Sequence, residues 1–222
     1  MKFRAAIFDM DGKLVNTLDD LADSVNEMLE HFNLPTKTVD EVRLAVGNGA
    51  MKLMERTALL GDKATDESFL IEALNYYDGC YKRRLLNKTK PYDGIIKFLT
   101  ELNSKKIPLG ICTNKQHFAA IEIAEKILSP IKFDAVIGDK RDKPKKPDPT
   151  NALSIAKKFN VKPDEVAYFG DTAVDVQTAI NAGFFPIGVT WGFRPESELI
   201  ETGAKLIVHH PSEILKAISF ER

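Results

Sequence analysis

Carboxylates occur at two places in this sequence with spacings that suit catalysis or metal binding. Asp9 and Asp11 are separated by one residue, and Asp171 is followed one helical turn later by Asp175. A carboxylate can act as a nucleophile, and a neighbouring carboxyl group can donate and accept protons. Asp9, Asp171 and Asp175 also supply the hard oxygen ligands that Mg²⁺ prefers.

Two further stretches carry groups that bind anions. Thr113 offers a hydroxyl, Asn114 offers a backbone N–H, and Lys146 offers an ammonium group. Lys143 and Lys145 compete with Lys146 for this role, and a run of lysines alone is typical of a solvated loop. The pattern Lys-Pro-x-Pro favours Lys146. Each fragment alone is ordinary turn chemistry, so the prediction depends on their occurring together in this order.

Short apolar runs alternate with amphipathic stretches over most of the chain. The predicted strands are Ala5–Phe8, Ile107–Cys112, Ala135–Ile137, Val166–Phe169, Phe185–Val189 and Leu206–Val208. Predicted helices cover Gly94–Lys105, His117–Leu128, Thr150–Phe159, Ala173–Ala182 and Ser212–Ile218. This alternation indicates an α/β fold, a Rossmann-like and mainly parallel sheet flanked by helices. Ligands bind such sheets beyond the carboxyl ends of the strands, where the residues above fall.

One segment, from about Thr17 to Leu86, contains helical patterns and no convincing strand. Leu18, Leu21, Val25, Met28, Leu29 and Phe32 recur at helical spacing, and Val42–Val46, Ala50–Leu60 and Phe69–Tyr81 predict further helices. The breaks fall at Gly47-Asn48-Gly49 and at Gly61-Asp62. The sequence therefore predicts a helical cap over residues 17–86, inserted into a catalytic core formed by residues 1–16 and 87–222.

Composition narrows the class of protein. The 222 residues include 31 basic and 32 acidic side chains, for a net charge of −1, which gives no electrostatic footprint for nucleic acid or an anionic membrane. No stretch approaches the ~20 apolar residues of a membrane helix. The two cysteines, Cys80 and Cys112, lack metal-ligand spacing. We expect a cytoplasmic globular protein, a monomer or a homodimer.

Four stretches together resemble the motifs of the haloacid dehalogenase superfamily of phosphatases. They are Asp9–Gly12, Thr113-Asn114, Lys146–Pro149 and Gly170–Asp175. The stretches Val46–Ala50, Thr113–Lys115, Lys145–Pro149 and Gly188–Gly192 are similar to its phosphoglycolate phosphatase branch. The resemblance implies a Mg²⁺-dependent hydrolase of a small phosphorylated metabolite, with 2-phosphoglycolate as the expected substrate. A related pyrophosphatase, nucleotide phosphatase or sugar-phosphate phosphatase is the alternative. A catalytically weakened protein that binds a phosphorylated ligand, or a regulatory protein, is the alternative of another class.

The resemblance also implies roles for the core residues. Asp9 would attack phosphorus and form an aspartyl-phosphate, while Asp11 would protonate the leaving group and then activate water. Mg²⁺ would be bound by Asp9, the backbone carbonyl of Asp11 and Asp171, and Asp175 would orient a bound water or support the ligands. Thr113, Asn114 and Lys146 would bind the phosphoryl group.

Substrate selection is expected from the cap and from one core lysine. Gly47 and Asn48 lie at a cap break that could approach the ligand. Arg43, Lys52 and Arg56 are candidates to bind a substrate carboxylate, although ordinary charges on helix surfaces explain them better. Lys115 is a further candidate because it follows Thr113-Asn114.

Lys13 departs from the family pattern, which usually has Thr or Val at this position. Because it directly follows Gly12, we predict that its side chain faces the site. An ammonium group there would add positive charge where Mg²⁺ must bind, and it is the only support for a weakened enzyme.

Overall fold

The computed structural model describes residues 1–58, 66–141 and 144–221, which form two compact units. The core unit comprises Met1–Asn16 and Pro91–Arg222, and the cap unit comprises Thr17–Lys90. The cap unit thus ends at Lys90, whereas the sequence pattern placed its end at Leu86. The predicted break at Gly61-Asp62, the last residues of the predicted helix Ala50–Leu60, and Lys143 lie outside the described residues.

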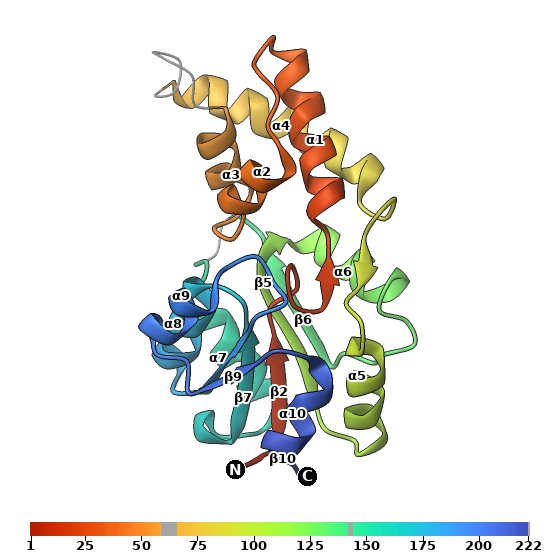
Figure 1. The fold of residues 1–222 in the computed structure, drawn as a ribbon, viewed down its shortest axis with the longest axis vertical. Helices are drawn as coiled ribbons and strands as arrows, with labels where there is room; N and C mark the ends of the chain where they lie inside the picture. Colours follow the sequence, from red (N-terminus) through yellow and green to blue (C-terminus); the bar gives the residue numbers. More distant parts are fainter. Residues whose placement is uncertain (59–65, 142–143, 222) are drawn as a thin grey trace. The chain divides into compact units, whose positions relative to one another are not determined.

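A six-stranded sheet forms the centre of the core unit (Figure 1). Its strands are β2 (Ala5–Phe8), β5 (Leu109–Gln116), β6 (Ala135–Asp139), β7 (Val166–Gly170), β8 (Phe185–Val189) and β9 (Leu206–Val208). The order is β6-β5-β2-β7-β8-β9, and every neighbouring pair is parallel. The predicted Rossmann-like α/β fold is confirmed. After β2 the chain continues to β5 on one side of β2, and after β6 it continues to β7 on the other side. The order of strands therefore reverses at β2, and ligands bind such sheets at the carboxyl ends of the strands beside this point.

Helices cover both faces of this sheet (Figure 1). They are α5 (Ile95–Ser104), α6 (His117–Lys126), α7 (Thr150–Phe159) and α8 (Ala173–Ala182). Successive side chains of β2 point to opposite faces of the sheet. Ile7 packs in a buried cluster with Ile155 of α7 and Ala179 of α8. Phe8 faces the other way, with its ring centroid 6.2 Å from that of Phe98 on α5. Packing on both faces fixes the strand end from which Asp9 projects.

The prediction for the second site-bearing strand needs a correction. β5 continues to Gln116, so Thr113 and Asn114 lie within the strand instead of beyond an end at Cys112. Its register with β6 shifts between Cys112 and Gln116, where Gln116 pairs with Asp139. This irregular, polar extension has no apolar alternation from which a strand could be predicted.

Short elements complete the core unit. They are β1 (Lys2–Phe3), β3 (Val15–Asn16), η2 (Pro163–Glu165), α9 (Glu196–Thr202), α10 (Pro211–Ala217) and β10 (Ser219–Phe220), with β4 (Lys90–Pro91) at the boundary with the cap unit. β1 pairs with β10 in parallel. The sequence analysis missed α9, a short helix in which only Leu199 is buried.

In the described part of the cap unit the helices are α1 (Leu18–His31), α2 (Val39–Ala45), α3 (Ala50–Thr57) and α4 (Glu67–Arg84). The apolar face predicted for α1 is buried at Leu21, Val25, Met28 and Leu29. Asp20 is also buried, and it accepts hydrogen bonds from the backbone N–H of Lys88 and from both the N–H and the hydroxyl of Thr89. None of the described helices combines the length and the apolar character that a membrane crossing requires.

Candidate active site

The chain turns sharply after β2, and this turn places Asp9 and Asp11. The backbone N–H of Asp9 still donates to the carbonyl of Phe169 on β7, at 3.1 Å. Gly12 then adopts a φ of +81°, and a Cβ there would lie 2.2 Å from Oδ2 of Asp171. Only glycine combines this backbone conformation with so close an approach. The spacing Asp-x-Asp-Gly therefore fits a strand end packed directly against a second carboxylate.

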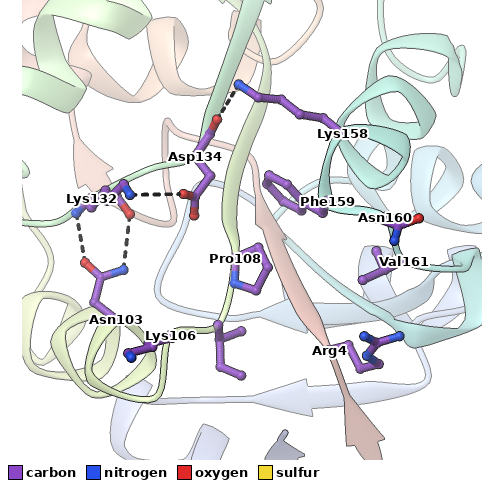
Figure 2. A pocket seen from close by; sticks show the side chains of 11 residues that line it. Arg4, Asn103, Lys106, Pro108, Lys132, Asp134, Lys158, Phe159, Asn160 and Val161 are labelled. Carbon is purple, nitrogen blue, oxygen red and sulfur yellow. Dashed lines mark hydrogen bonds and ion pairs between the residues drawn. The ribbon is translucent and has the colours of Figure 1, made fainter. Parts of the chain in front are cut away.

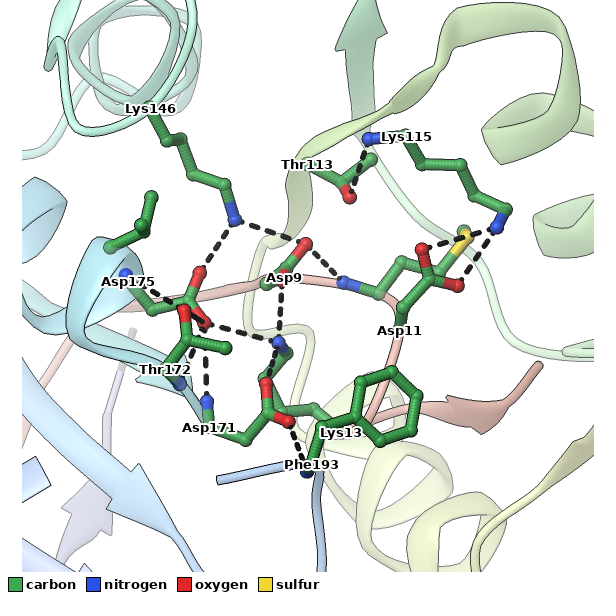
Figure 3. Close-up of polar contacts among 12 residues, drawn as sticks. Asp9, Asp11, Lys13, Thr113, Lys115, Lys146, Asp171, Thr172, Asp175 and Phe193 are labelled. Atoms are coloured by element: carbon green, nitrogen blue, oxygen red, sulfur yellow. Dashed lines mark hydrogen bonds and ion pairs between the residues drawn. The ribbon is translucent and has the colours of Figure 1, made fainter. Parts of the chain in front are cut away.

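Asp9, Asp171 and Asp175, here called the acidic cluster, come together from the ends of β2 and β7 and the first turn of α8 (Figure 3). Each offers one carboxylate oxygen, and these oxygens all lie within 4.8 Å of one another. Three hard oxygen donors at this spacing fit a divalent cation such as Mg²⁺. The predicted set of metal-binding side chains is thus one compact group.

Lys13 points into the acidic cluster, as predicted. Its Nζ lies 2.5 Å from Oδ2 of Asp9, 2.5 Å from Oδ1 of Asp171 and 3.2 Å from Oδ2 of Asp175 (Figure 3). The side chain is only 1% exposed. Burial lowers the pKa of Lys13, but the three carboxylates raise it well above its usual value, so the group is an ammonium ion.

Lys146 is the second cation of this site. Its Nζ lies 3.0 Å from Oδ1 of Asp9 and 2.6 Å from Oδ1 of Asp175. The competing Lys145 instead forms an ion pair with Asp139 at 2.8 Å. Asn114 holds the backbone of Lys146, since its Oδ1 accepts from the Lys146 N–H at 2.9 Å and its Nδ2 donates to the Lys146 carbonyl at 3.1 Å. The structure therefore gives Asn114 a positioning contact that the sequence did not predict.

Lys13 and Lys146 lower the pKa of the Asp9 carboxyl group. Burial raises the pKa of Asp9, but Lys13, Lys146 and the hydroxyl of Thr113 together hold it far below its usual value. Asp9 is therefore an ionised carboxylate. Burial raises the pKa of Asp171 above its usual value against the opposing effect of Lys13.

Asp175 has two structural functions. Its backbone N–H donates to the hydroxyl of Thr172, while its Oδ2 accepts from the N–H and the hydroxyl of Thr172, which forms a capping box at the start of α8. The same carboxylate contacts Lys13 and Lys146. Gly170 makes room for it, because a Cβ at Gly170 would lie 2.0 Å from the Cβ of Asp175.

The loop after β8 contributes groups that the sequence analysis did not identify. The backbone N–H of Phe193 donates to Oδ2 of Asp171 at 2.6 Å, and the indole N–H of Trp191 donates to the carbonyl of Lys13 at 3.1 Å. Both bonds hold members of the site. Gly192 between them was the available signal, because a Cβ there would lie 2.3 Å from the Cβ of Asp171.

Asp11 forms a separate ion pair with Lys115. The Lys115 Nζ lies 2.9 Å from Oδ1 and 3.1 Å from Oδ2 of Asp11, and its side chain is 3% exposed. The backbone N–H of Lys115 also donates to the hydroxyl of Thr113. The site thus presents an acid–base candidate from the turn after β2, and a hydroxyl and a third ammonium group from β5.

The predicted cap residues belong to the other unit. Gly47 and Asn48 lie between α2 and α3, where Oδ1 of Asn48 accepts from Arg56 at 2.8 Å. Arg43 is paired with Asp40, and Lys52 with Glu55. These contacts are all within the cap unit, and a role for its residues in substrate binding stays a prediction.

A cavity of 790 Å³ occurs elsewhere in the core unit (Figure 2). It is lined by Pro108, Arg4 and Val161, which precede the amino ends of β5, β2 and β7, together with Asn103, Lys132, Asp134 and Lys158. None of the predicted site residues lines it. The candidate active site is therefore the group at the carboxyl ends of the strands.

A parallel sheet with paired aspartates, a threonine and a lysine at its carboxyl edge defines a class of hydrolytic enzyme. The sequence model of the haloacid dehalogenase-like hydrolase family matches residues 6–189, and the chain belongs to this family. It is 31% identical to the phosphoglycolate phosphatase of Chromobacterium violaceum over 212 residues, which cover 95% of this chain and 94% of that protein.

Two other similarities bear on function. The chain is 29% identical to the N-acetylmuramic acid 6-phosphate phosphatase of Pseudomonas putida, over 98% of this chain and 97% of that protein. The crystal structure of a predicted phosphoglycolate phosphatase from Haemophilus somnus 129PT superposes with a TM-score of 0.85 at 26% identity, covering 97% of each chain. The family and the fold are therefore the ones that the sequence analysis predicted.

Proposed function

We propose that this hydrolase is a phosphomonoesterase that cleaves 2-phosphoglycolate to glycolate and phosphate through an aspartyl-phosphate on Asp9. The observation that carries the proposal is the position of the Asp9 carboxylate at the carboxyl end of β2, where its Oδ1 lies 3.0 Å from Nζ of Lys146. An ionised carboxylate can attack phosphorus, and a buried ammonium group can stabilise the negative charge of the transferring phosphoryl group.

In the first half-reaction, an oxygen of Asp9 forms a bond to phosphorus as the bond to the leaving alkoxide breaks. Asp11 protonates that alkoxide, while Lys146, the Thr113 hydroxyl and the Asn114 backbone N–H bind the phosphoryl oxygens. In the second half-reaction, Asp11 removes a proton from water, which attacks phosphorus and releases phosphate from Asp9. Both oxygens of Asp11 contact Lys115 in this structure, so this ion pair must open before Asp11 can reach the leaving group.

The acidic cluster would hold Mg²⁺ through Asp9, Asp171 and the backbone carbonyl of Asp11, with Asp175 supporting the ligands. When bound, the ion would screen the carboxylates from the phosphate and stabilise charge on the transferring group. The side chain of Lys13 must leave the cluster for these carboxylates to take up the ion.

Lys115 supports a substrate that carries its own carboxylate. Because Asp11 is the proposed acid for the leaving group, Lys115 lies on the leaving-group side of Asp9. Glycolate is a short leaving group whose carboxylate lies close to the cleaved oxygen, so an ammonium group there can pair with it. We propose that Lys115 exchanges Asp11 for this carboxylate when the substrate binds.

A sugar-phosphate phosphatase is the second candidate, because one relative is an N-acetylmuramic acid 6-phosphate phosphatase. Phosphate release from a panel of substrates in excess Mg²⁺ tests both proposals. The panel contains 2-phosphoglycolate, N-acetylmuramic acid 6-phosphate, a hexose phosphate, a nucleotide and pyrophosphate. The highest kcat/KM is expected for 2-phosphoglycolate, and a higher value for the muramic acid phosphate would establish the second candidate instead.

A further inference from the structure

We propose that Lys13 is a tethered cation that fills the divalent-metal position of the acidic cluster and competes with the metal ion for its carboxylate ligands. The inference rests on the proposed function, since it assumes that the acidic cluster is the metal site of this hydrolase. It adds a built-in competitor that sets how much free metal the enzyme needs.

The position of the Nζ atom carries the argument. It contacts one oxygen of each carboxylate at 2.5, 2.5 and 3.2 Å. An ammonium group has three N–H donors, and here each has a carboxylate acceptor (Figure 3). A Mg²⁺ ion binds oxygen at about 2.0–2.1 Å, so an ion bound by these oxygens would occupy the volume of the ammonium nitrogen. The two cations therefore exclude each other.

Charge balance favours the same conclusion. Counted by formal charge, the carboxylates of Asp9, Asp171 and Asp175 and the ammonium groups of Lys13 and Lys146 carry one net negative charge. A divalent ion added beside both lysines would make this buried group positive, which is costly in a region shielded from water. Departure of the Lys13 side chain removes that excess.

The backbone of Lys13 is held while its side chain exchanges. Its carbonyl accepts from the indole of Trp191 at 3.1 Å, and its N–H donates to the carbonyl of Met10 at 3.4 Å. The ammonium group thus stays close to the cluster after it leaves, at a high effective concentration. A tethered competitor of this kind weakens metal binding without being consumed or diluted.

The direct test is Mn²⁺ binding, measured from the electron paramagnetic resonance signal of free Mn²⁺. The proteins compared are the unaltered chain, Lys13→Met and Lys105→Met. Lys13→Met removes the charge and shortens the side chain by one heavy atom, and Lys105 is an exposed lysine paired with Glu101 in the same unit. We expect Lys13→Met to bind Mn²⁺ at least tenfold more tightly than the other two proteins. Equal dissociation constants for all three would overturn the proposal.

Loss of Lys13 leaves buried carboxylates that repel one another, so folding must be followed as well. Lys13→Thr in chelator should melt at a lower temperature than the unaltered chain, and Mn²⁺ should raise its melting temperature by much more. If Mn²⁺ raises both equally, Lys13 does not compete. Phosphate release by the unaltered chain is measured separately. If that chain has no phosphatase activity, the proposed function is refuted. If Lys13→Met still binds Mn²⁺ more tightly than the unaltered chain, the inference about Lys13 stands.

Discussion

The side chain of Asn114 forms two hydrogen bonds with the backbone of Lys146, one to its N–H and one to its carbonyl. The two residues are 32 positions apart in the sequence, so this bridge fixes a loop lysine against a strand of the sheet. The position of Lys146 beside Asp9 therefore depends on the side-chain amide of Asn114. This amide need not contact the substrate to have that effect.

Asn114→Ala should therefore lower kcat as well as stability. Loss of the two buried bonds should cost about 1–3 kcal/mol in the free energy of unfolding, measured in urea. Asn103→Ala is the matched control, because Asn103 forms the same two bonds with the backbone of Lys132 away from the site. A variant at Asn114 that loses stability but keeps the kcat of the control would show that the bridge is purely structural.

Substitution of the two aspartates after β2 should separate the half-reactions. Asp9→Asn should have no turnover and form no phosphoenzyme, because the nucleophile is lost. Asp11→Asn should turn over slowly, since both the leaving group and the attacking water lose their proton-transfer group. The measurement is acid quenching with phosphate-labelled substrate, followed by mapping of the labelled peptide. Label on Asp11 in the unaltered chain would reverse the assignment.

Removal of divalent metal should abolish activity without unfolding the protein. In EDTA we expect phosphate release to cease and Mg²⁺ to restore it, while Ca²⁺ restores little because its coordination is larger and looser. The melting temperature in EDTA should stay close to that in Mg²⁺, because Lys13 compensates the acidic cluster when the ion is absent. Full turnover in EDTA would exclude the proposed role of Mg²⁺.

Lys115→Met should weaken selection for a substrate carboxylate. Loss of one charge-assisted contact costs about 1.5–3 kcal/mol, so kcat/KM for 2-phosphoglycolate should fall roughly 10- to 150-fold. Phosphate esters without a carboxylate should lose less, and their decrease measures the effect that acts through Asp11. An equal decrease for both classes of substrate would rule out a carboxylate contact.

Asp20→Asn should destabilise the cap unit. Three donors from Lys88 and Thr89 converge on the buried Asp20 carboxylate, and an amide keeps only one accepting oxygen. The expected loss in urea unfolding is about 1–3 kcal/mol. Asp23→Asn serves as the control, because its partly exposed pair with the Lys88 side chain should contribute little. If the two variants have equal stability, the buried hydrogen bonds of Asp20 do not stabilise the cap.

Most strands and helices were predictable because their apolar spacing is regular. β2, β8 and β9 have the predicted limits, and so do α7 and α8. The extension of β5 was not predictable, because its polar residues pair through an irregular register. The short helix α9 exposes most of its residues, so it carries no apolar stripe from which a helix could be inferred.

Within the site, residue types were easier to predict than partners. The proximity of Asp9 and Asp171 follows from parallel strands that end at one edge. The pairing of Lys115 with Asp11 does not, because the sequence analysis assigned Lys115 to a substrate carboxylate and no partner to Asp11. The three contacts of Lys13 likewise depend on the path of the turn at Gly12. The Phe193 N–H was missed because a backbone donor leaves no trace in the residue type.

Asp175 joins the charged cluster to the backbone that leads into α8. Its Oδ2 accepts from the N–H groups of Asp171 and Thr172 while it also contacts Lys13. A change of cation beside Asp175 therefore alters the strength of two backbone hydrogen bonds at the start of a helix. The rate at which these two amides exchange with deuterated solvent should therefore depend on which cation the cluster holds. Hydrogen exchange at Asp171 and Thr172 thus reports whether the Lys13 ammonium group or a metal ion occupies the cluster.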